Sequence, residues 1–255
     1  MTDLTQYPLL FGVVSLAVLW LAAFSGSALG LRREAPDQDW RDGFAVVRAA
    51  TLTLLGLVIG FTFSMATNRY DLRKTLEEAE ANAIGTEYVR ADLLPADAGA
   101  RLRAQLKTYV DARVEFYSTR DTDALDRLAR RTASAQADLW ATVRGPALAQ
   151  PSPITALVVA GLNDVLNSQG YTQAAWWNRI PMAAWGLMGL IAICCNLLVG
   201  YGHQKWKAGS RLFFVLPLVI AVSFTLIADI DAPRHGIIRV APQNLQSLQQ
   251  SLRPG

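Results

Sequence analysis

The chain has 255 residues, of which 52% are hydrophobic and only 18% are charged. Its mean hydropathy is positive, and the apolar residues are concentrated toward the two ends, with a more polar stretch between them. This distribution is typical of a membrane protein with an extramembrane insert. The excess of 24 Lys and Arg over 21 Asp and Glu is too small and too dispersed to indicate a nucleic-acid partner.

The first apolar run, Pro8–Gly30, carries no charge and is long enough to cross a bilayer. The residues before it contain no Lys or Arg, so we interpret the run as a retained transmembrane helix rather than a secretory signal peptide. It ends in Gly26-Ser-Ala-Leu-Gly30, a small-xxx-small spacing that allows close contact between helices. We expect that contact to lie within one subunit.

The second apolar run, residues 44–67, continues without proline into a charged segment that ends at Leu94. A single helix through residues 44–94 would be roughly 75 Å long, more than twice the hydrocarbon thickness of a bilayer. Gly56 and Gly60 give this run a second close-approach spacing. Phe61 and Met65 could form a hydrophobic constriction if several copies of the helix ringed an axis. Packing against the other spans is the simpler interpretation of both side chains.

Beyond Asn68 the pattern becomes amphipathic, and its apolar positions recur at helical steps: Leu72, Leu76, Ala79 and Ala83. Arg73 and Glu77 form a favourable i,i+4 pair on another face. Asn82 and Thr86 also lie one turn apart. They either line a polar path or hydrogen-bond a neighbouring helix, and the second interpretation is favoured.

Residues 68–181 show helical periodicity throughout and predict an all-helical extramembrane domain of about 110 residues, within the usual domain size. Asp97, Asp121 and Ser152 are the predicted N-caps of its helices. Gly145 followed by Pro146 predicts the end of the second of them.

Three residues mark the return of the chain to the membrane as an interfacial aromatic and cationic anchor: Trp176, Trp177 and Arg179. Two further apolar runs follow, at about 182–201 and 212–228, and each is long enough to be a span. The adjacent cysteines in the first of these runs, Cys194 and Cys195, indicate neither a disulfide framework nor a zinc site.

After the last span come two carboxylates two residues apart, Asp229 and Asp231, with Arg234 close behind. The carboxylates could bind a cation, but a metal site needs more ligands and the chain has only two histidines. A structural clamp at the membrane edge, formed by these three residues, is therefore favoured over a metal site or catalysis. No cofactor is predicted. The tail ends in a short amphipathic helix with Leu245 on its apolar face.

The predicted fold is an all-α membrane protein with four transmembrane helices in two hairpins, in which the second helix extends into an inserted extramembrane helical domain. The predicted parts are a first hairpin (1–67, with spans at about 8–30 and 44–67), the helical domain (68–181), a second hairpin (182–229) and a tail (230–255). Four spans place both termini and the helical domain on one side. Basic residues near the membrane are nearly balanced between the two sides, so they do not fix the orientation.

Five segments resemble, in order and spacing, an uncharacterised bacterial membrane family described as bestrophin-like: GFTFSMATNRYDLRKTLEEAEANAIGTEYVRADLLP, YVDARVEFY, LNDVLNSQ, NRIP and IADIDAPRHG. The resemblance extends from about Gly56 to Leu252. Three positions depart from the family pattern, which has charged residues in place of Asn167, Ala232 and a residue near Gln173.

Bestrophins are pentameric anion channels with four membrane helices per subunit and helical cytosolic regions, and bacterial relatives can favour cations. The resemblance therefore implies a homo-oligomer, by analogy a pentamer, with inorganic ions as its ligands. It also implies a multi-pass protein of the bacterial inner membrane with its helical domain in the cytoplasm. A second membrane helix lines the bestrophin pore, and by analogy the hydrophobic neck falls here on Leu54, Leu57, Val58, Phe61 and Met65.

Two functions remain open. The first is a homo-oligomeric ion channel with the second transmembrane helix around the pore. The second is a membrane-anchored sensor or scaffold whose helical domain binds a protein partner. An enzyme is not expected, because the chain has no nucleophile elbow, phosphate-binding loop, HExxH motif or histidine cluster.

Overall fold

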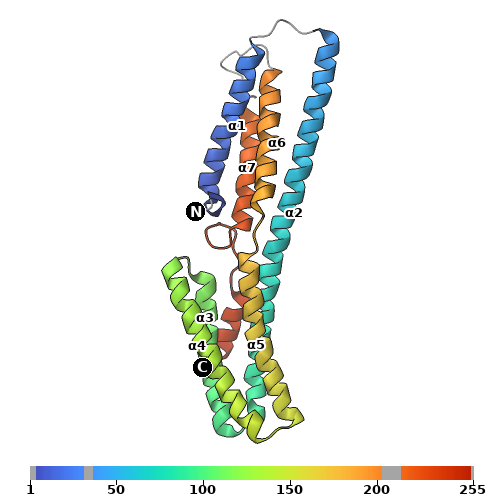
Figure 1. Cartoon of the computed structure of the whole chain (residues 1–255). Coiled ribbons are helices and arrows are strands. Elements are labelled where there is room, and N and C mark those ends of the chain that lie inside the picture. Colours follow the sequence, from blue (N-terminus) through green and yellow to red (C-terminus); the bar gives the residue numbers. More distant parts are fainter. Residues whose placement is uncertain (1–3, 32–36, 203–213, 254–255) are drawn as a thin grey trace. The chain divides into compact units, whose positions relative to one another are not determined.

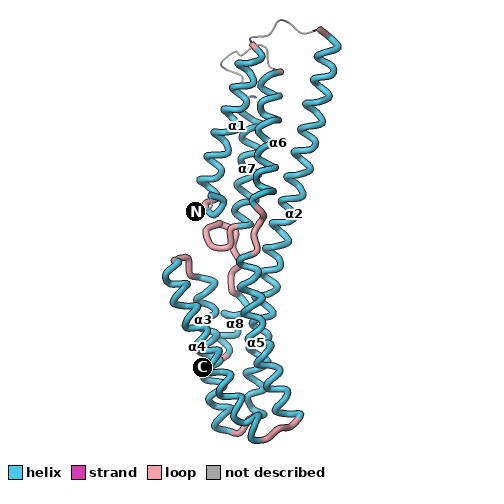
Figure 2. Tube along the Cα trace, in the orientation of Figure 1, coloured by secondary structure: helices cyan, strands magenta, loops and turns pink. Residues whose placement is uncertain are grey.

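The computed structural model describes residues 4–31, 37–202 and 214–253, and within these ranges it is helical throughout, with no strand (Figures 1 and 2). The chain forms two compact units. The first, here the membrane unit, comprises residues 1–69 and 179–238. The second, here the helical domain, comprises residues 70–178 and 239–255. Helix α2 (Gln38–Arg90) is continuous and contributes to both units.

The membrane unit contains a short 3-10 helix, three α-helices and the first part of α2: η1 (Leu4–Gln6), α1 (Pro8–Gly30), α6 (Met182–Tyr201) and α7 (Val215–Asp231). Helix α1 packs against both α6 and α7 (Figure 1). Phe11 of α1 meets the indole of Trp185 edge-on, with ring centroids 5.0 Å apart, and stacks on Phe224 of α7. Apolar side chains therefore hold these three helices together.

Helices α1 and α6 approach each other closely at glycines. A Cβ atom at Gly26 would lie 2.1 Å from the carbonyl oxygen of Leu197, and one at Gly200 would lie 2.0 Å from that of Ala23. A Cβ at Gly30 would be 2.6 Å from the carbonyl oxygen of Tyr201. The expected contact at Gly26 and Gly30 within the subunit is confirmed, because only residues without a side chain fit there.

Three helical stretches are long and apolar enough to cross a membrane: Pro8–Gly30, Gln38–Leu93 and Pro153–Tyr201, the last of which contains α6. The predicted fourth span, 212–228, begins outside the described residues, and the described helix there, α7, starts at Val215 and continues to Asp231. Helix α2 begins at Gln38, earlier than the predicted start at Phe44, because Asp37 accepts a hydrogen bond from the backbone N–H of Trp40.

The helical domain contains the second part of α2, the 3-10 helix η2 (Ala91–Leu93) and four further helices: α3 (Ala96–Ser118), α4 (Thr122–Ala149), α5 (Pro153–Trp177) and α8 (Gln243–Ser251). Its core is formed by fully buried side chains from several of these helices, among them Leu102, Leu106, Leu139, Leu162 and Leu245. Burial of these apolar surfaces is the main driving force for folding of the domain.

Two of the three predicted N-caps are present. The carboxylate of Asp121 accepts a hydrogen bond from the N–H of Ala124, and Ser152 forms a reciprocal capping box with Thr155. The prediction for Asp97 is wrong, since α3 already begins at Ala96 and has no side-chain cap.

The predicted end of α4 is also wrong. Pro146 lies in its last turn, where it removes only one helical hydrogen bond, and the helix continues to Ala149.

Candidate functional site

The apolar half of α2 is almost uncovered by its own chain. Only 6% of its most apolar 18-residue segment is buried, against 28% of the corresponding segment in each of the other two candidate spans. Its contacts with α6 include ring contacts of Trp40 and Phe44 with Tyr201, and a hydrogen bond from the Cys195 thiol to the carbonyl oxygen of Thr51. A membrane helix so little covered within one chain has most of its surface available to lipid or to other subunits.

The candidate neck residues share one uncovered side of α2. Leu54, Leu57, Phe61 and Met65 are spaced by three, four and four residues, and all four side chains are exposed. Phe61 projects most, with 65% of its surface exposed. Val58 lies at the edge of this stripe and is half-buried. The residues of this half that face the chain itself are on a separate stripe and are buried: Leu55, Thr62 and Ala66.

Gly56 and Gly60 lie on a further uncovered side of α2. A Cβ atom at either glycine would meet no other atom within 4 Å in the described structure. The two glycines of α1 at the same spacing, Gly26 and Gly30, are in close contact with α6. The close-approach spacing on α2 therefore makes no helix contact within the part of the chain that the structure describes.

In the helical domain, α2 buries a stripe of charged residues. Its members recur at steps of four, three, four and three residues, and each is at most 1% exposed. They are the charged residues Arg73, Glu77, Glu80 and Glu87, with the apolar Ile84 between the last two. Of the apolar positions that share a face by sequence periodicity, Leu72 and Ala79 are exposed and Leu76 and Ala83 are half-buried. Arg73 and Glu77, on another face, are buried. Buried charges of this kind need hydrogen-bonding partners, and helices α3, α5 and α8 supply them for Glu77 and Glu80.

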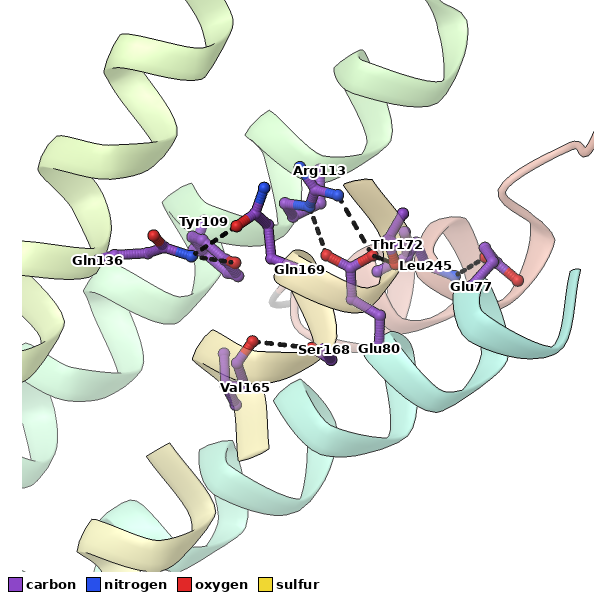
Figure 3. Close-up of polar contacts among 10 residues, drawn as sticks. All are labelled: Glu77, Glu80, Tyr109, Arg113, Gln136, Val165, Ser168, Gln169, Thr172 and Leu245. Carbon is purple, nitrogen blue, oxygen red and sulfur yellow. Dashed lines mark hydrogen bonds and ion pairs between the residues drawn. The ribbon is translucent and has the colours of Figure 1, made fainter. Parts of the chain in front are cut away.

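Glu77 and Glu80 are held by different helices (Figure 3). The carboxylate of Glu77 accepts hydrogen bonds from the backbone N–H of Leu245 at 2.9 Å and from Nδ2 of Asn244 at 2.7 Å, both on α8. Glu80 forms a buried ion pair with Arg113 of α3 and accepts a hydrogen bond from the hydroxyl of Thr172 on α5 at 3.1 Å. The two carboxylates thus join α2 to three other helices of the domain.

Charge in this network is stabilised locally. Burial alone would lower the pKa of Arg113, but the carboxylate of Glu80 outweighs that effect and the pKa is raised, so the guanidinium stays charged. Burial raises the pKa of Tyr109 to about 12, and its hydroxyl accepts a hydrogen bond from Gln136 of α4 (Figure 3). Tyr109 therefore remains neutral at all physiological pH values.

Asn82 and Thr86 line a polar groove of about 490 Å³ between α2 and α8. Its other walls include Asn244, Ser247 and Ser251 of α8. The side chains of Asn82 and Thr86 are exposed, and no hydrogen bond from either is recorded within the described part of the chain. The groove carries amide and hydroxyl groups without formal charge.

Asp229 and Asp231 lie in the last turn of α7, not after it as predicted, because the helix extends to Asp231. The Asp231 carboxylate accepts hydrogen bonds from the backbone N–H of Ile180 and forms ion pairs with Arg69 at 3.5 Å and Arg179 at 3.4 Å. Through these hydrogen bonds and ion pairs, the Asp231 side chain of α7 connects α2 and the segment before α6 within the membrane unit.

The Asp229 carboxylate accepts hydrogen bonds from the N–H groups of Ile237 and Ile238, at 2.7 and 2.8 Å. Arg234 is half-buried in the turn that these bonds close. Gly236 completes the turn, since a Cβ there would lie 2.3 Å from the carbonyl oxygen of Asp229. The Asp229 carboxylate thus binds backbone N–H groups, and the Asp231 carboxylate binds a backbone N–H and two arginines. The described residues contain no cluster of three or more potential metal ligands.

The three predicted anchor residues have different environments. Trp176 is buried in the helical domain, where its ring packs edge-on against Phe116 and Tyr117. Trp177 is exposed. Arg179 lies in the membrane unit, where its guanidinium donates to the hydroxyl of Thr5 at 3.1 Å in addition to its contact with Asp231. Of the two tryptophans, only Trp177 is available to a membrane interface.

Comparisons with known proteins identify the family and the fold of the chain. The model of the family described as Bestrophin-like domain matches residues 14–245. No curated protein matches the chain. Crystal structures of a bacterial bestrophin homologue from Klebsiella pneumoniae are similar in fold, and a tyrosine-to-alanine variant gives a TM-score of 0.65 at 14% identity, covering 94% of this chain and 97% of that one.

Two further structures of the Klebsiella pneumoniae homologue agree with this match. A tryptophan-to-alanine variant gives a TM-score of 0.67 at 13% identity, over 94% of this chain and 95% of that one. The structure phased with zinc gives 0.61 at 14% identity, over 94% and 96%. At these identities the structural likeness concerns the fold, and the family model covers well over half of the chain. The chain therefore belongs to the bestrophin-like family.

Proposed function

We propose that this protein is a homo-oligomeric ion channel of the bacterial inner membrane, with α2 of each subunit around a central pore. The observation that carries this proposal is the apolar half of α2, which is 6% buried within its own chain although it is long enough to span the membrane. A helix with so few partners in its own subunit is suited to contacts with its counterparts in other subunits. Membership of a family whose relatives are ion channels supports the same function.

The two uncovered sides of α2 suit the two requirements of a helix in a ring. We assign the stripe of Leu54, Leu57, Phe61 and Met65 to the pore axis, where large apolar side chains form a neck that gates by dewetting. We assign Gly56 and Gly60 to the contact with the neighbouring subunit, because small residues let two backbones approach closely. A pentamer is the arrangement that the family resemblance implies.

The proposal includes four spans per subunit in two hairpins, with α7 in the fourth span. The helical domain and both termini then share one side, which we assign to the cytoplasm by analogy with bestrophins. A reporter fused after Gly255 tests the orientation. Activity in the cytoplasm is expected, and activity in the periplasm alone would reverse the assignment.

Ion flux through reconstituted protein tests the pore. Purified full-length protein in liposomes should conduct at least one class of small ion, and Phe61→Ala should raise the flux because it widens the apolar neck. Leu21→Ala is the matched control, since Leu21 is also an exposed apolar side chain of a membrane helix but lies on α1. Flux that Leu21→Ala changes as much as Phe61→Ala would contradict the assigned neck. Oligomers that pass neither anions nor cations would favour the alternative function, a membrane-anchored sensor or scaffold.

A further inference from the structure

Glu87 differs from the other buried glutamates of α2. Its side chain is fully buried, as are those of Glu77 and Glu80. Those two carboxylates accept hydrogen bonds from α5 or α8, whereas neither oxygen of Glu87 has a hydrogen-bond partner in the described part of the chain. An ionised carboxylate in such a place lacks both water and protein donors, and this is a costly arrangement.

The Glu87 carboxylate lies against the backbone of α5 at Gly161. A Cβ atom on Gly161 would be 2.1 Å from Oε2 of Glu87 and 2.4 Å from Nη1 of Arg90, so the side chains of both α2 residues occupy the space that this glycine leaves. Nη1 of Arg90 donates to the carbonyl oxygen of Leu157 on α5 at 3.3 Å. The guanidinium is therefore close to the carboxylate but is bonded to α5 instead.

The other charged groups near Glu87 do not compensate for its burial. Asp164, on the facing helix α5, adds a second negative charge. Asp92 of η2, the element that follows α2, is paired with Arg103 of α3. Arg90 is the cation that opposes the effect of burial. Burial, with a contribution from Asp164 and against Arg90, raises the pKa of Glu87 from 4.5 to about 8.

We propose that Glu87 is a proton-binding site of the helical domain, and that the proton controls the contact between α2 and α5. With the proton bound, the neutral carboxylic acid packs against Gly161 and Arg90 stays on the Leu157 carbonyl. When the proton leaves, the carboxylate recruits Arg90 as its counter-ion and the guanidinium leaves Leu157. Helix α5 then loses one of its bonds to α2. The inference concerns the helical domain alone and holds whether or not the protein conducts ions.

Proton linkage fixes the direction of the effect. The unfolded chain releases this proton near pH 4.5 and the folded chain retains it to about pH 8. The stabilisation that the bound proton provides is therefore fully present below about pH 4.5 and is lost as the pH rises through about 8. One pH unit above the folded pKa, the closed contact should be about tenfold less populated relative to its value at low pH.

Hydrogen exchange read by mass spectrometry, on the full-length protein in detergent, tests this site. After correction for the intrinsic rate, amides of residues 154–165 should lose about tenfold in protection between pH 7 and pH 9. Glu87→Gln, which stays neutral, should show no such loss. Glu78→Gln, a change at an exposed position of the same helix, should behave as wild type. An equal loss of protection in wild type and Glu87→Gln would overturn the proposal.

Difference infrared spectroscopy between pH 6 and pH 9 gives a readout that does not depend on the opening of α5. Wild type and Glu78→Gln should lose the carbonyl band of one protonated carboxylic acid over this range, and Glu87→Gln should lack that band. A wild-type spectrum with no protonated carboxylic acid at pH 6 would show that Glu87 is already ionised, and the proposed site would then be refuted.

Discussion

Removal of Arg113 offers a sharp test of the buried network that holds α2 in the helical domain. Arg113 is 1% exposed and Glu80 is fully buried, so Arg113→Met keeps the apolar bulk of the side chain but removes the counter-ion of a buried carboxylate. Among the described residues, the Thr172 hydroxyl is then its remaining donor. Breaking one partner of a buried ion pair costs about 3–5 kcal/mol. At roughly 2–4 °C per kcal/mol in a protein of this size, the melting temperature should fall by on the order of 10 °C.

Circular dichroism of the full-length protein in detergent measures this change, and a second variant separates its cause. Glu80→Leu combined with Arg113→Met removes both charges and should recover most of the lost stability, because an apolar pair of similar volume often replaces a buried ion pair without loss. A double variant as unstable as the single one would refute this reasoning.

The remaining predictions concern packing, capping and the glycines. Leu139→Ala, in the core of the helical domain, should cost about 2–5 kcal/mol in unfolding free energy, and a loss below 1 kcal/mol would mean that the site collapses or is loosely packed. Ser152→Ala should cost about 1 kcal/mol through loss of the α5 cap, measured by chemical denaturation, and no change would contradict the capping box. Gly26→Val should lower the melting temperature, because overpacking costs about 1–3 kcal/mol. Gly60→Val should leave the melting temperature of the isolated subunit unchanged and reduce the oligomeric fraction in size-exclusion chromatography, and the opposite pattern would show that α2 packs within its own chain.

The features that the sequence could predict depend on local patterns. The helical class and the long continuous α2 follow from apolar periodicity and from the lack of proline between residues 44 and 94. Ser152 before Pro153 identifies a helix start, because both residue types suit the orphan N–H groups there. The small-residue spacing at Gly26 identifies a close helix contact, although the sequence does not name α6 as its partner.

The features that were missed depend on tertiary partners. Glu77, Glu80 and Glu87 are buried because α3, α5 and α8 pack over them, and charged residues in an amphipathic pattern are ordinarily assigned to the exposed side. Their steps of three and seven residues, continued by Ile84, are the only local signal for this buried side. The ion pairs of Asp231 with Arg69 and Arg179 join residues far apart in sequence, so no local pattern predicts them.

The number and arrangement of subunits in detergent-purified protein test the central claim most directly. Single-particle imaging, with native mass as a check on subunit count, should show a closed ring of identical subunits with α2 innermost and Phe61 toward the axis. A stable monomer, or a ring in which the exposed stripe of α2 faces lipid, would contradict the assignment of α2 as the pore helix.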